Sequence, residues 1–501
     1  MSSCYGLSAR HRETSQRPLE QTAIYTNNTL NDCQYSLLRS MLRSMSKPKS
    51  ATQATSSPRQ AAYTTLQRLS GSDLHADDLI DQELSHNQLQ GPDRGLFAEL
   101  VFGVLRRQGT LDHYLKQLVQ QPLERVELPV LLLLRLGLYQ LRYLDRVPSH
   151  AAVHATVELT NEILPRAKGL INGVLRSYLR QQETLTLPDP AQQPAAWLSA
   201  AYSVPGWLAE QWLQQFPQNE AAGLAAASTE IPPLTLRVNT LRITRSALLE
   251  RLQAAEFAAE ACRFAPEGIQ ILQRCQITSL PGFAEGLFMV QDEASQLVAH
   301  LLAPQIGEQV LDMCAAPGGK ATHLAQLMND QGCVNATDLN ARRIRRICES
   351  AERLGLNSIQ AVAGDALGND YLEGLQFDRI LLDAPCSGLG VIRRNPEAKW
   401  RLIPTEISRC AARQRLLINA AASRLKPGGV LVYATCSTAV EEDEAVIKDF
   451  LSRNPEFVVE NGAQLFPEWA DLFDNSGYLR AWPHRHGTDG FFAARLTRIN
   501  R

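Results

Sequence analysis

The chain has 501 residues, of which 45% are hydrophobic and 20% charged, with a formal net charge of −2. At roughly 150 residues per domain, this length predicts about three domains. The near-neutral charge excludes a globally basic protein, so any contact with a nucleic acid must come from local basic patches. Ten cysteines without a CxxC pair argue against a zinc ribbon and against a secreted disulfide framework.

No stretch of the chain predicts a membrane span. The longest apolar run, residues 128–144, is interrupted by Arg135, Gln140 and Arg142 and is shorter than the roughly 20 residues that cross a bilayer. The first residues contain no apolar region of the kind found in secretory signals. We therefore expect a cytoplasmic monomer with reduced thiols, no metal and no membrane partner.

Residues 1–57 are rich in Ser, Thr, Gln and Asn and have no sustained apolar period, which predicts a disordered N-terminal extension. Met41 and Met45 are possible alternative starts near its end.

Residues 58–186 have apolar side chains at three- and four-residue spacing, which predicts an all-helical bundle. Three of its segments, LRLGLYQL (134–141), VPSHAAVHATVEL (147–159) and GLINGVLR (169–176), resemble the antitermination factor NusB. The resemblance implies an RNA-binding domain. A bundle used only for packing remains the alternative.

Residues 187–231 begin as a linker rich in Pro, Gln and Ala and continue as a helical stretch that carries tryptophans. Residues 232–290 alternate short strand and helix patterns and predict a small α+β module. From residue 291 to 501, six strand patterns are separated by segments of helical length. This order is typical of a Rossmann-like, doubly wound α/β domain with a largely parallel sheet.

A strand, a glycine turn and a helix start follow one another between residues 310 and 322. Glycines let the backbone approach a ligand, and the helix start leaves N–H groups free. GxGxxG is absent, so the turn favours a cofactor with a positive sulfonium and an amino-acid tail over a dinucleotide. Asp338 and Asp365 end the next two strands and are placed for the ribose and the adenine. The predicted cofactor-binding residues are Cys314, Ala315, Ala316, Pro317, Gly318, Gly319, Lys320, Asp338, Asp365 and Asp383.

Two thiols follow two other predicted strands. Asp383-Ala384-Pro385-Cys386-Ser387-Gly388 comes directly after an apolar run, and Thr435-Cys436-Ser437 comes after the next one. Because open α/β sheets bind ligands at the carboxyl ends of their strands, we expect both thiols at one site.

The segments DMCAAPGGKATHLA, DAPCSGLGVIRRNPE, YATCSTAVEEDEAVI and GTDGFFAARL resemble the RNA (cytosine-5)-methyltransferases of the NOL1/NOP2/Sun family. The resemblance covers about 270 residues. It implies S-adenosylmethionine as the cofactor and, with the NusB-like domain in front, a cytosine in 16S rRNA or in an assembly intermediate of the small subunit as the target. It also implies that Cys436 is the nucleophile, that Cys386 assists product release, that Asp383 holds the cytosine and that Lys320 stabilises charge.

Several alternatives stay open. The Pro-Cys dipeptide of Cys386 is the context that DNA cytosine-5 methyltransferases use for their nucleophile, so the two thiol roles could be reversed. The same chemistry could act on tRNA, or the chain could be a non-catalytic RNA-binding assembly or antitermination factor. We predict RNA contacts for Arg343, Arg393, Arg394 and Trp400, and we interpret Glu441, Glu442 and Glu444 as an acidic helix start that stabilises the helix dipole.

Overall fold

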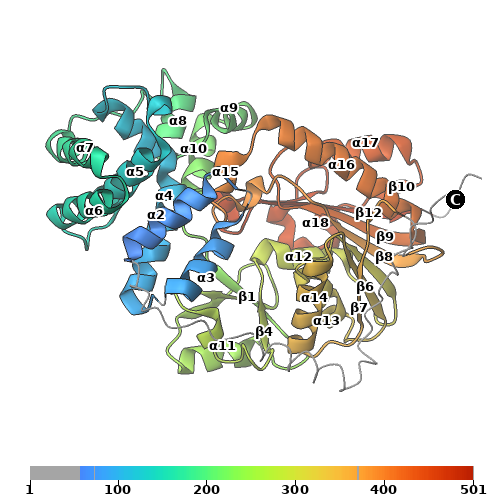
Figure 1. Cartoon of the computed structure of the whole chain (residues 1–501). Coiled ribbons are helices and arrows are strands. Elements are labelled where there is room, and N and C mark those ends of the chain that lie inside the picture. Colours follow the sequence, from blue (N-terminus) through green and yellow to red (C-terminus); the bar gives the residue numbers. More distant parts are fainter. Residues whose placement is uncertain (1–56, 73, 88, 369–371, 500–501) are drawn as a thin grey trace, which may run out of the picture.

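The computed structural model describes residues 57–499 apart from 73, 88 and 369–371. Figure 1 shows a helical bundle beside a larger body that contains a small sheet and a large helix-covered sheet. The predicted fold class, a NusB-like bundle followed by a small α+β module and a Rossmann-like domain, is confirmed. The predicted disordered extension lies outside the described residues except for Ser57.

The bundle is built around α5 (Leu128–Tyr143), whose side chains from Leu132 to Gln140 are all buried. A helix that is apolar nearly all round must be enclosed by other helices, and α5 contacts four of them. The other helices of the bundle are α2 (Pro58–Leu69), α3 (Ala76–Asn87), α4 (Gly91–Leu118), α6 (Ser149–Ile163) and α7 (Lys168–Gln181).

Three helices form a layer between the bundle and the large sheet: α8 (Pro194–Tyr202), α9 (Gly206–Gln215) and α10 (Gln218–Ala227). They share a core around the buried Trp212, and this core extends to Leu389 and Ile392 in the segment after strand β8 (Phe377–Asp383). The layer therefore connects the bundle to the loop that carries Cys386.

The small module is a four-stranded antiparallel sheet in the order β2-β3-β1-β4 with one helix on it. Its elements are β1 (Leu234–Val238), α11 (Arg245–Ala254), β2 (Ala259–Ala261), β3 (Gly268–Ile271) and β4 (Phe288–Val290).

The large sheet has the order β10-β12-β9-β8-β5-β6-β7, and β11 pairs with β12. The strands from β9 to β7 run parallel, whereas β10, β11 and β12 are antiparallel additions at one edge. The strand bounds are β5 (Gln309–Met313), β6 (Cys333–Asp338), β7 (Ile359–Ala363), β8 (Phe377–Asp383), β9 (Leu425–Thr435), β10 (Phe457–Val459), β11 (Leu479–Ala481) and β12 (Phe491–Arg498).

Helices cover both faces of this sheet, and Figure 1 shows α16 and α17 on one side and α12, α13 and α14 on the other. Apolar side chains fill both interfaces, as expected for a parallel sheet buried on two sides. The helices of this region are α12 (Glu293–Leu302), α13 (Gly319–Leu327), α14 (Ala341–Leu354), α15 (Ala398–Arg401), α16 (Pro404–Ser423), α17 (Glu444–Arg453), α18 (Gly462–Leu465) and α19 (Pro483–His486).

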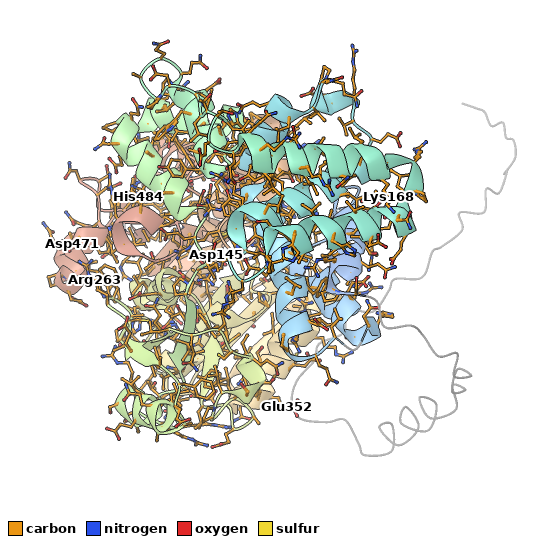
Figure 2. The ribbon with its side chains drawn as sticks, turned by 90° about the vertical axis from the view of Figure 1, so that its left-hand side faces the viewer. Asp145, Lys168, Arg263, Glu352, Asp471 and His484 are labelled. Atoms are coloured by element: carbon orange, nitrogen blue, oxygen red, sulfur yellow. The ribbon has the colours of Figure 1, made fainter. Side chains whose placement is uncertain are left out.

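Polar contacts attach the small module to the large domain. Glu267, just before β3, accepts a hydrogen bond from His300 of α12 at 2.8 Å and lies 3.8 Å from His323 of α13. On the surface, Arg263 and Asp471 lie side by side in Figure 2 and form an ion pair at 3.1 Å. The module is thus held against the helix that follows the predicted cofactor turn.

Within the described part of the chain, no helix is both long enough and apolar enough to cross a membrane.

Candidate active site

The predicted cofactor turn lies between the end of β5 at Met313 and the start of α13 at Gly319. Gly318 has φ = 103°, and a Cβ there would come within 3.1 Å of the Ile347 backbone, so only glycine fits without strain. The first N–H groups of a helix have no partners within it, so the turn offers donors to a ligand.

A buried arginine supports this turn from the small module. Arg237 of β1 donates to Thr322 at 2.9 Å and to the Gly319 carbonyl at 2.5 Å. Burial lowers its pKa to about 9. This residue was not predicted, because an arginine within a strand pattern carries no local sign that it reaches a helix more than 80 residues away.

Of the two aspartates predicted to end the strands after the turn, Asp338 does so and Asp365 lies just beyond its strand. Asp338 ends β6, is 5% exposed, and accepts a hydrogen bond from the Asn340 N–H at 2.9 Å. Asp365 lies two residues after β7, is exposed and accepts from the Leu367 N–H at 3.1 Å. Local turn contacts therefore fix both carboxylates, and Arg343 connects Asp338 to the cofactor turn.

A further carboxylate, Asp312 of β5, is fully buried, and neither of its oxygens meets a hydrogen-bond donor among the described residues. Burial raises its pKa well above the usual value, and the charge of Asp383 adds to this. A buried polar group without a partner is costly. A cationic or hydrogen-bond-donating ligand would supply the missing partner, which fits the positively charged sulfonium and amino group of S-adenosylmethionine.

Lys320 and Asp383 form a pair at the centre of the site. The Lys320 Nζ donates to Asp383 Oδ2 at 2.8 Å and lies 5.1 Å from the centre of the Phe491 ring. Burial alone would lower the pKa of Lys320, but the carboxylate of Asp383 raises it above its usual value. The lysine is therefore a charged donor next to the end of β8.

The structure brings the two predicted thiols together: the Sγ atoms of Cys386 and Cys436 are 3.3 Å apart. The hydrogen bond to Cys436 and burial raise the pKa of Cys386 well above that of an ordinary thiol. Cys314, in contrast, lies in the cofactor turn with φ = 62°, and its pKa is raised to about 12 by burial. Of the three thiols at strand ends, Cys386 and Cys436 are thus the adjacent pair.

Backbone contacts join the loops that carry these thiols to the GTDGFF segment. The Gly390 N–H donates to the Cys436 carbonyl at 2.9 Å, and the Gly490 N–H donates to the Gly390 carbonyl at 2.9 Å. A Cβ on Gly390 would collide with the Gly490 backbone, so this close approach requires glycine.

The interpretation of Glu442 as part of a helix start is wrong. Helix α17 begins at Glu444, and Glu442 is a fully buried residue in the turn before it. Its carboxylate accepts hydrogen bonds from Ser387 and Ser437, the neighbours of the two thiols. The sequence signal was available, since Glu442 follows Cys436 by only six residues, but an acidic run before a helix usually faces solvent.

Three of the four predicted RNA contacts have partners inside the protein instead. Arg393 is 3% exposed and donates to Asp489 at 2.8 Å. Arg394 bonds to the same carboxylate and to Asp292 at 2.9 Å. The indole N–H of Trp400 donates to the Leu105 carbonyl in the bundle at 2.7 Å. These side chains join parts of the fold. Arg393 is too buried to contact RNA, so its assignment is corrected, whereas Arg394 and Trp400 are partly exposed and their contact with RNA stays a prediction.

Arg343, the fourth, is 49% exposed in its side chain and bridges the cofactor turn and β6. Its guanidinium donates to the Ala316 carbonyl at 2.7 Å and lies 3.3 Å from Asp338.

Three family descriptions match the chain in order. A NusB family model matches residues 56–180, a ferredoxin-like domain of RsmF/B-like methyltransferases matches 204–278, and a model of 16S rRNA methyltransferase RsmB/F matches 299–497.

Individual relatives agree with these models. The chain is 39% identical over 88% of its length to a probable ribosomal RNA small subunit methyltransferase B from Synechocystis, of which 99% is covered. It is 37% identical over 87% of its length to the probable protein of that name from Bacillus subtilis, of which 97% is covered.

Among solved structures, NSun6 from Pyrococcus horikoshii, solved with the S-adenosylmethionine analogue SFG, matches 58% of this chain and 97% of its own at 26% identity and a TM-score of 0.52. S-adenosylmethionine is thus the cofactor of this chain, and its binding by the strand-end carboxylates and the glycine turn stays a prediction. The chain is a member of the RsmB/F family of 16S rRNA methyltransferases.

Proposed function

We propose that this chain transfers a methyl group to carbon 5 of a cytosine in 16S rRNA through a covalent bond between Cys436 and carbon 6 of the base. The observation that carries the proposal is the 3.3 Å separation of the Cys386 and Cys436 sulfurs beside the Lys320–Asp383 pair. Methyl transfer to an oxygen or a nitrogen needs no thiol nucleophile. Two adjacent thiols next to a charged lysine–aspartate pair therefore favour transfer to carbon.

Carbon 5 of cytosine is a poor nucleophile, so the chemistry needs prior addition of a thiolate to carbon 6. When bound, S-adenosylmethionine supplies an electrophilic methyl group. Cys436 adds to carbon 6, carbon 5 accepts the methyl group, a base removes the carbon 5 proton, and the bond from carbon 6 to sulfur breaks with its electrons leaving on Cys436.

The raised pKa of Cys386 supports this division of roles. A thiol that stays protonated can donate a hydrogen bond to the sulfur 3.3 Å away, both when that sulfur is a thiolate and when it leaves the base. Cys386 then assists release, and Cys436 is the nucleophile. The reversed assignment would require the proton to lie on Cys436 instead.

Asp383 and Lys320 are placed to bind the polar edge of the target base. Asp383, when protonated, would donate a hydrogen bond or a proton to N3, and Lys320 would stabilise the negative charge that develops when the thiolate adds. Because the two side chains now bond to each other, the cytosine would share or displace this contact as it enters the site.

RNA contacts beyond the target base would come from Arg343 and the NusB-like bundle. Arg343 is half exposed beside the cofactor turn. A groove of about 1290 Å³ runs along α6 and α7, and its lining includes Arg59, His150, His154 and Arg176. Cationic side chains in a groove of this size suit a phosphate backbone.

One assay tests the proposal against its alternatives. The full chain is incubated with methyl-labelled S-adenosylmethionine and either 16S rRNA or tRNA, and the product nucleoside is identified. We expect 5-methylcytidine in 16S rRNA alone. Transfer to tRNA alone would favour the tRNA alternative, and transfer to neither would favour a non-catalytic RNA-binding factor. Any other methylated nucleoside would reject the carbon 5 chemistry.

A further inference from the structure

Glu442 lies between the two thiol loops and contacts both of them. It occupies the turn between β9 and α17 and is fully buried. Burying a carboxylate costs free energy unless hydrogen bonds compensate for the lost contact with water. The groups that donate to Glu442 therefore indicate its role.

Four hydrogen bonds converge on this carboxylate. Oε1 accepts from the Ser387 N–H at 2.8 Å and from the Gln414 Nε2 at 3.1 Å. Oε2 accepts from the hydroxyl of Ser387 and from the hydroxyl of Ser437, the latter at 2.5 Å. Ser387 follows Cys386 directly and Ser437 follows Cys436. Each thiol is therefore one residue away from a serine that donates to the Glu442 carboxylate.

The contacts extend to the residue on the other side of Cys386. Gln414, on α16, donates to the Pro385 carbonyl at 2.9 Å as well as to Glu442. The Cys386 loop is thus held before and after its thiol, and the Cys436 loop is held by the same carboxylate. None of the four donors belongs to the cofactor turn.

We propose that Glu442 is a positioning residue that sets the distance between the Cys386 and Cys436 thiols. The inference rests on the proposed function, because only that reaction uses both sulfurs in succession. Misplacement of a reacting group by about 1 Å can cost a rate factor of about 100. The hydrogen bond with Cys436 and burial are the main causes of the raised pKa of Cys386, and the charge of Glu442 adds to them.

Thiol proximity can be measured without any RNA. Diamide oxidises two adjacent thiols to a disulfide and is itself reduced to the hydrazine. Its rate of forming the Cys386–Cys436 bond depends on how often the sulfurs meet and on how much of the attacking thiol is ionised, and Glu442→Asp, which keeps the charge, isolates the first. The variants are Glu442→Gln, Glu442→Asp and Glu442→Ala, and Glu441→Gln is the matched control, because its side chain is exposed one residue earlier. Disulfide formation is followed by peptide mass spectrometry.

We expect rapid crosslinking in the wild type and in Glu441→Gln. Glu442→Asp keeps the charge but is one methylene shorter, and it should crosslink at least about tenfold more slowly, as should Glu442→Ala. Glu442→Gln keeps the length of the side chain and should be slowed less. Binding of S-adenosylmethionine should stay within about twofold of wild type in every variant, since Glu442 contacts no residue of the cofactor turn.

Turnover on 16S rRNA should fall in the same order as the crosslinking rate, with kcat affected and the KM for S-adenosylmethionine unchanged. The double variant Ser387→Ala/Ser437→Ala, which removes two donors and leaves Glu442 in place, should show an intermediate loss.

Three results would overturn the inference: no crosslink in the wild type, wild-type crosslinking rates in Glu442→Asp and Glu442→Ala, or a parallel loss of cofactor binding that reveals a general role in folding. If Glu442→Ala does not fold, Glu442→Asp and the double serine variant decide the question by the same criteria. A wild-type protein that crosslinks but methylates no RNA would reject the proposed function without rejecting the positioning role.

Discussion

Two parts of one segment, which begins at the end of β8, were both predicted to contact the RNA substrate and have different environments in the structure. Residues 383–390 carry Asp383 and Cys386 and form one wall of the thiol site. Residues 393–401 carry arginines, a lysine and a tryptophan, which suggested RNA contact. They turn inward, with Lys399 fully buried and Trp400 bonded to the helical bundle.

The difference shows what a local motif can predict. Thiols, carboxylates and glycines at strand ends are needed for a particular reaction. Their pattern therefore indicates both the type of reaction and its location at the carboxyl ends of the strands. A cation has more than one good partner: an RNA phosphate, a carboxylate such as Asp489, or a backbone carbonyl such as that of Leu105. Only the tertiary contacts decide among these.

The largest expected effect tests the first part of the comparison. Cys436→Ala should lower kcat by at least about 1,000-fold and abolish any covalent RNA adduct, because no other residue then adds to carbon 6. The measurement is labelled methyl transfer together with a denaturing gel for the adduct. Cys275→Ala, a partly exposed thiol in the small module, is the control and should be fully active.

Cys386→Ala should reduce turnover between about 100- and 1,000-fold while the adduct accumulates, because addition proceeds and release is slowed. The same gel and the same control apply. If Cys436→Ala accumulates the adduct and Cys386→Ala does not, the two thiols have the opposite roles.

Asp383→Asn keeps the size of the side chain and removes its charge. We expect kcat to fall about 100-fold with adduct formation slowed to the same extent, since both need the base held at N3. Binding of S-adenosylmethionine should also be measured by titration. Unchanged adduct formation would place Asp383 outside the contact with the base.

Lys399 tests the second part of the comparison through pH. Burial, together with the charges of Arg106 and Arg107, lowers its pKa to about 7, and its ammonium donates to the Arg106 carbonyl at 3.2 Å. Between pH 7 and about 10.4, its pKa when unfolded, the unfolded chain binds more protons at this site, so stability rises with pH.

Lys399→Met should remove this dependence and stabilise the protein by about 4 kcal/mol near pH 7, with the gain vanishing above pH 10. Denaturant unfolding at a series of pH values measures it. Lys448→Met, at an exposed position of α17, is the control and should leave the pH profile unchanged. A wild-type profile in Lys399→Met would show that this lysine is not buried in solution.

The smallest effect concerns Trp400. Trp400→Phe keeps an aromatic ring but loses the hydrogen bond to the Leu105 carbonyl and the edge of the indole that lies near Gly109, so the free energy of unfolding should fall by about 1 kcal/mol or slightly more. The affinity for 16S rRNA should stay within about twofold. A tenfold loss of RNA affinity at unchanged stability would support the predicted contact of Trp400 with RNA.

The order of elements and the chemical groups of the site follow from the sequence by itself. Apolar periods of about 3.6 and short apolar runs reflect which faces must be buried, so the bundle, the small module and the parallel sheet could be predicted. The glycine turn before α13 and the acidic ends of β6 and β8 could be predicted as well, because the requirements for ligand binding there are local. The carboxyl ends of parallel strands then predict that Cys386 and Cys436 meet.

Only the tertiary structure decided which polar groups share a partner. Arg237 reaches Thr322 across 85 residues, and Glu442 joins serines from two loops. Asp312 is left buried without a partner among the described residues, and Arg393 is assigned to Asp489. Such contacts depend on distances between segments remote in sequence, and a hydrogen bond or an ion pair exists only at those distances, so no local pattern could have predicted them.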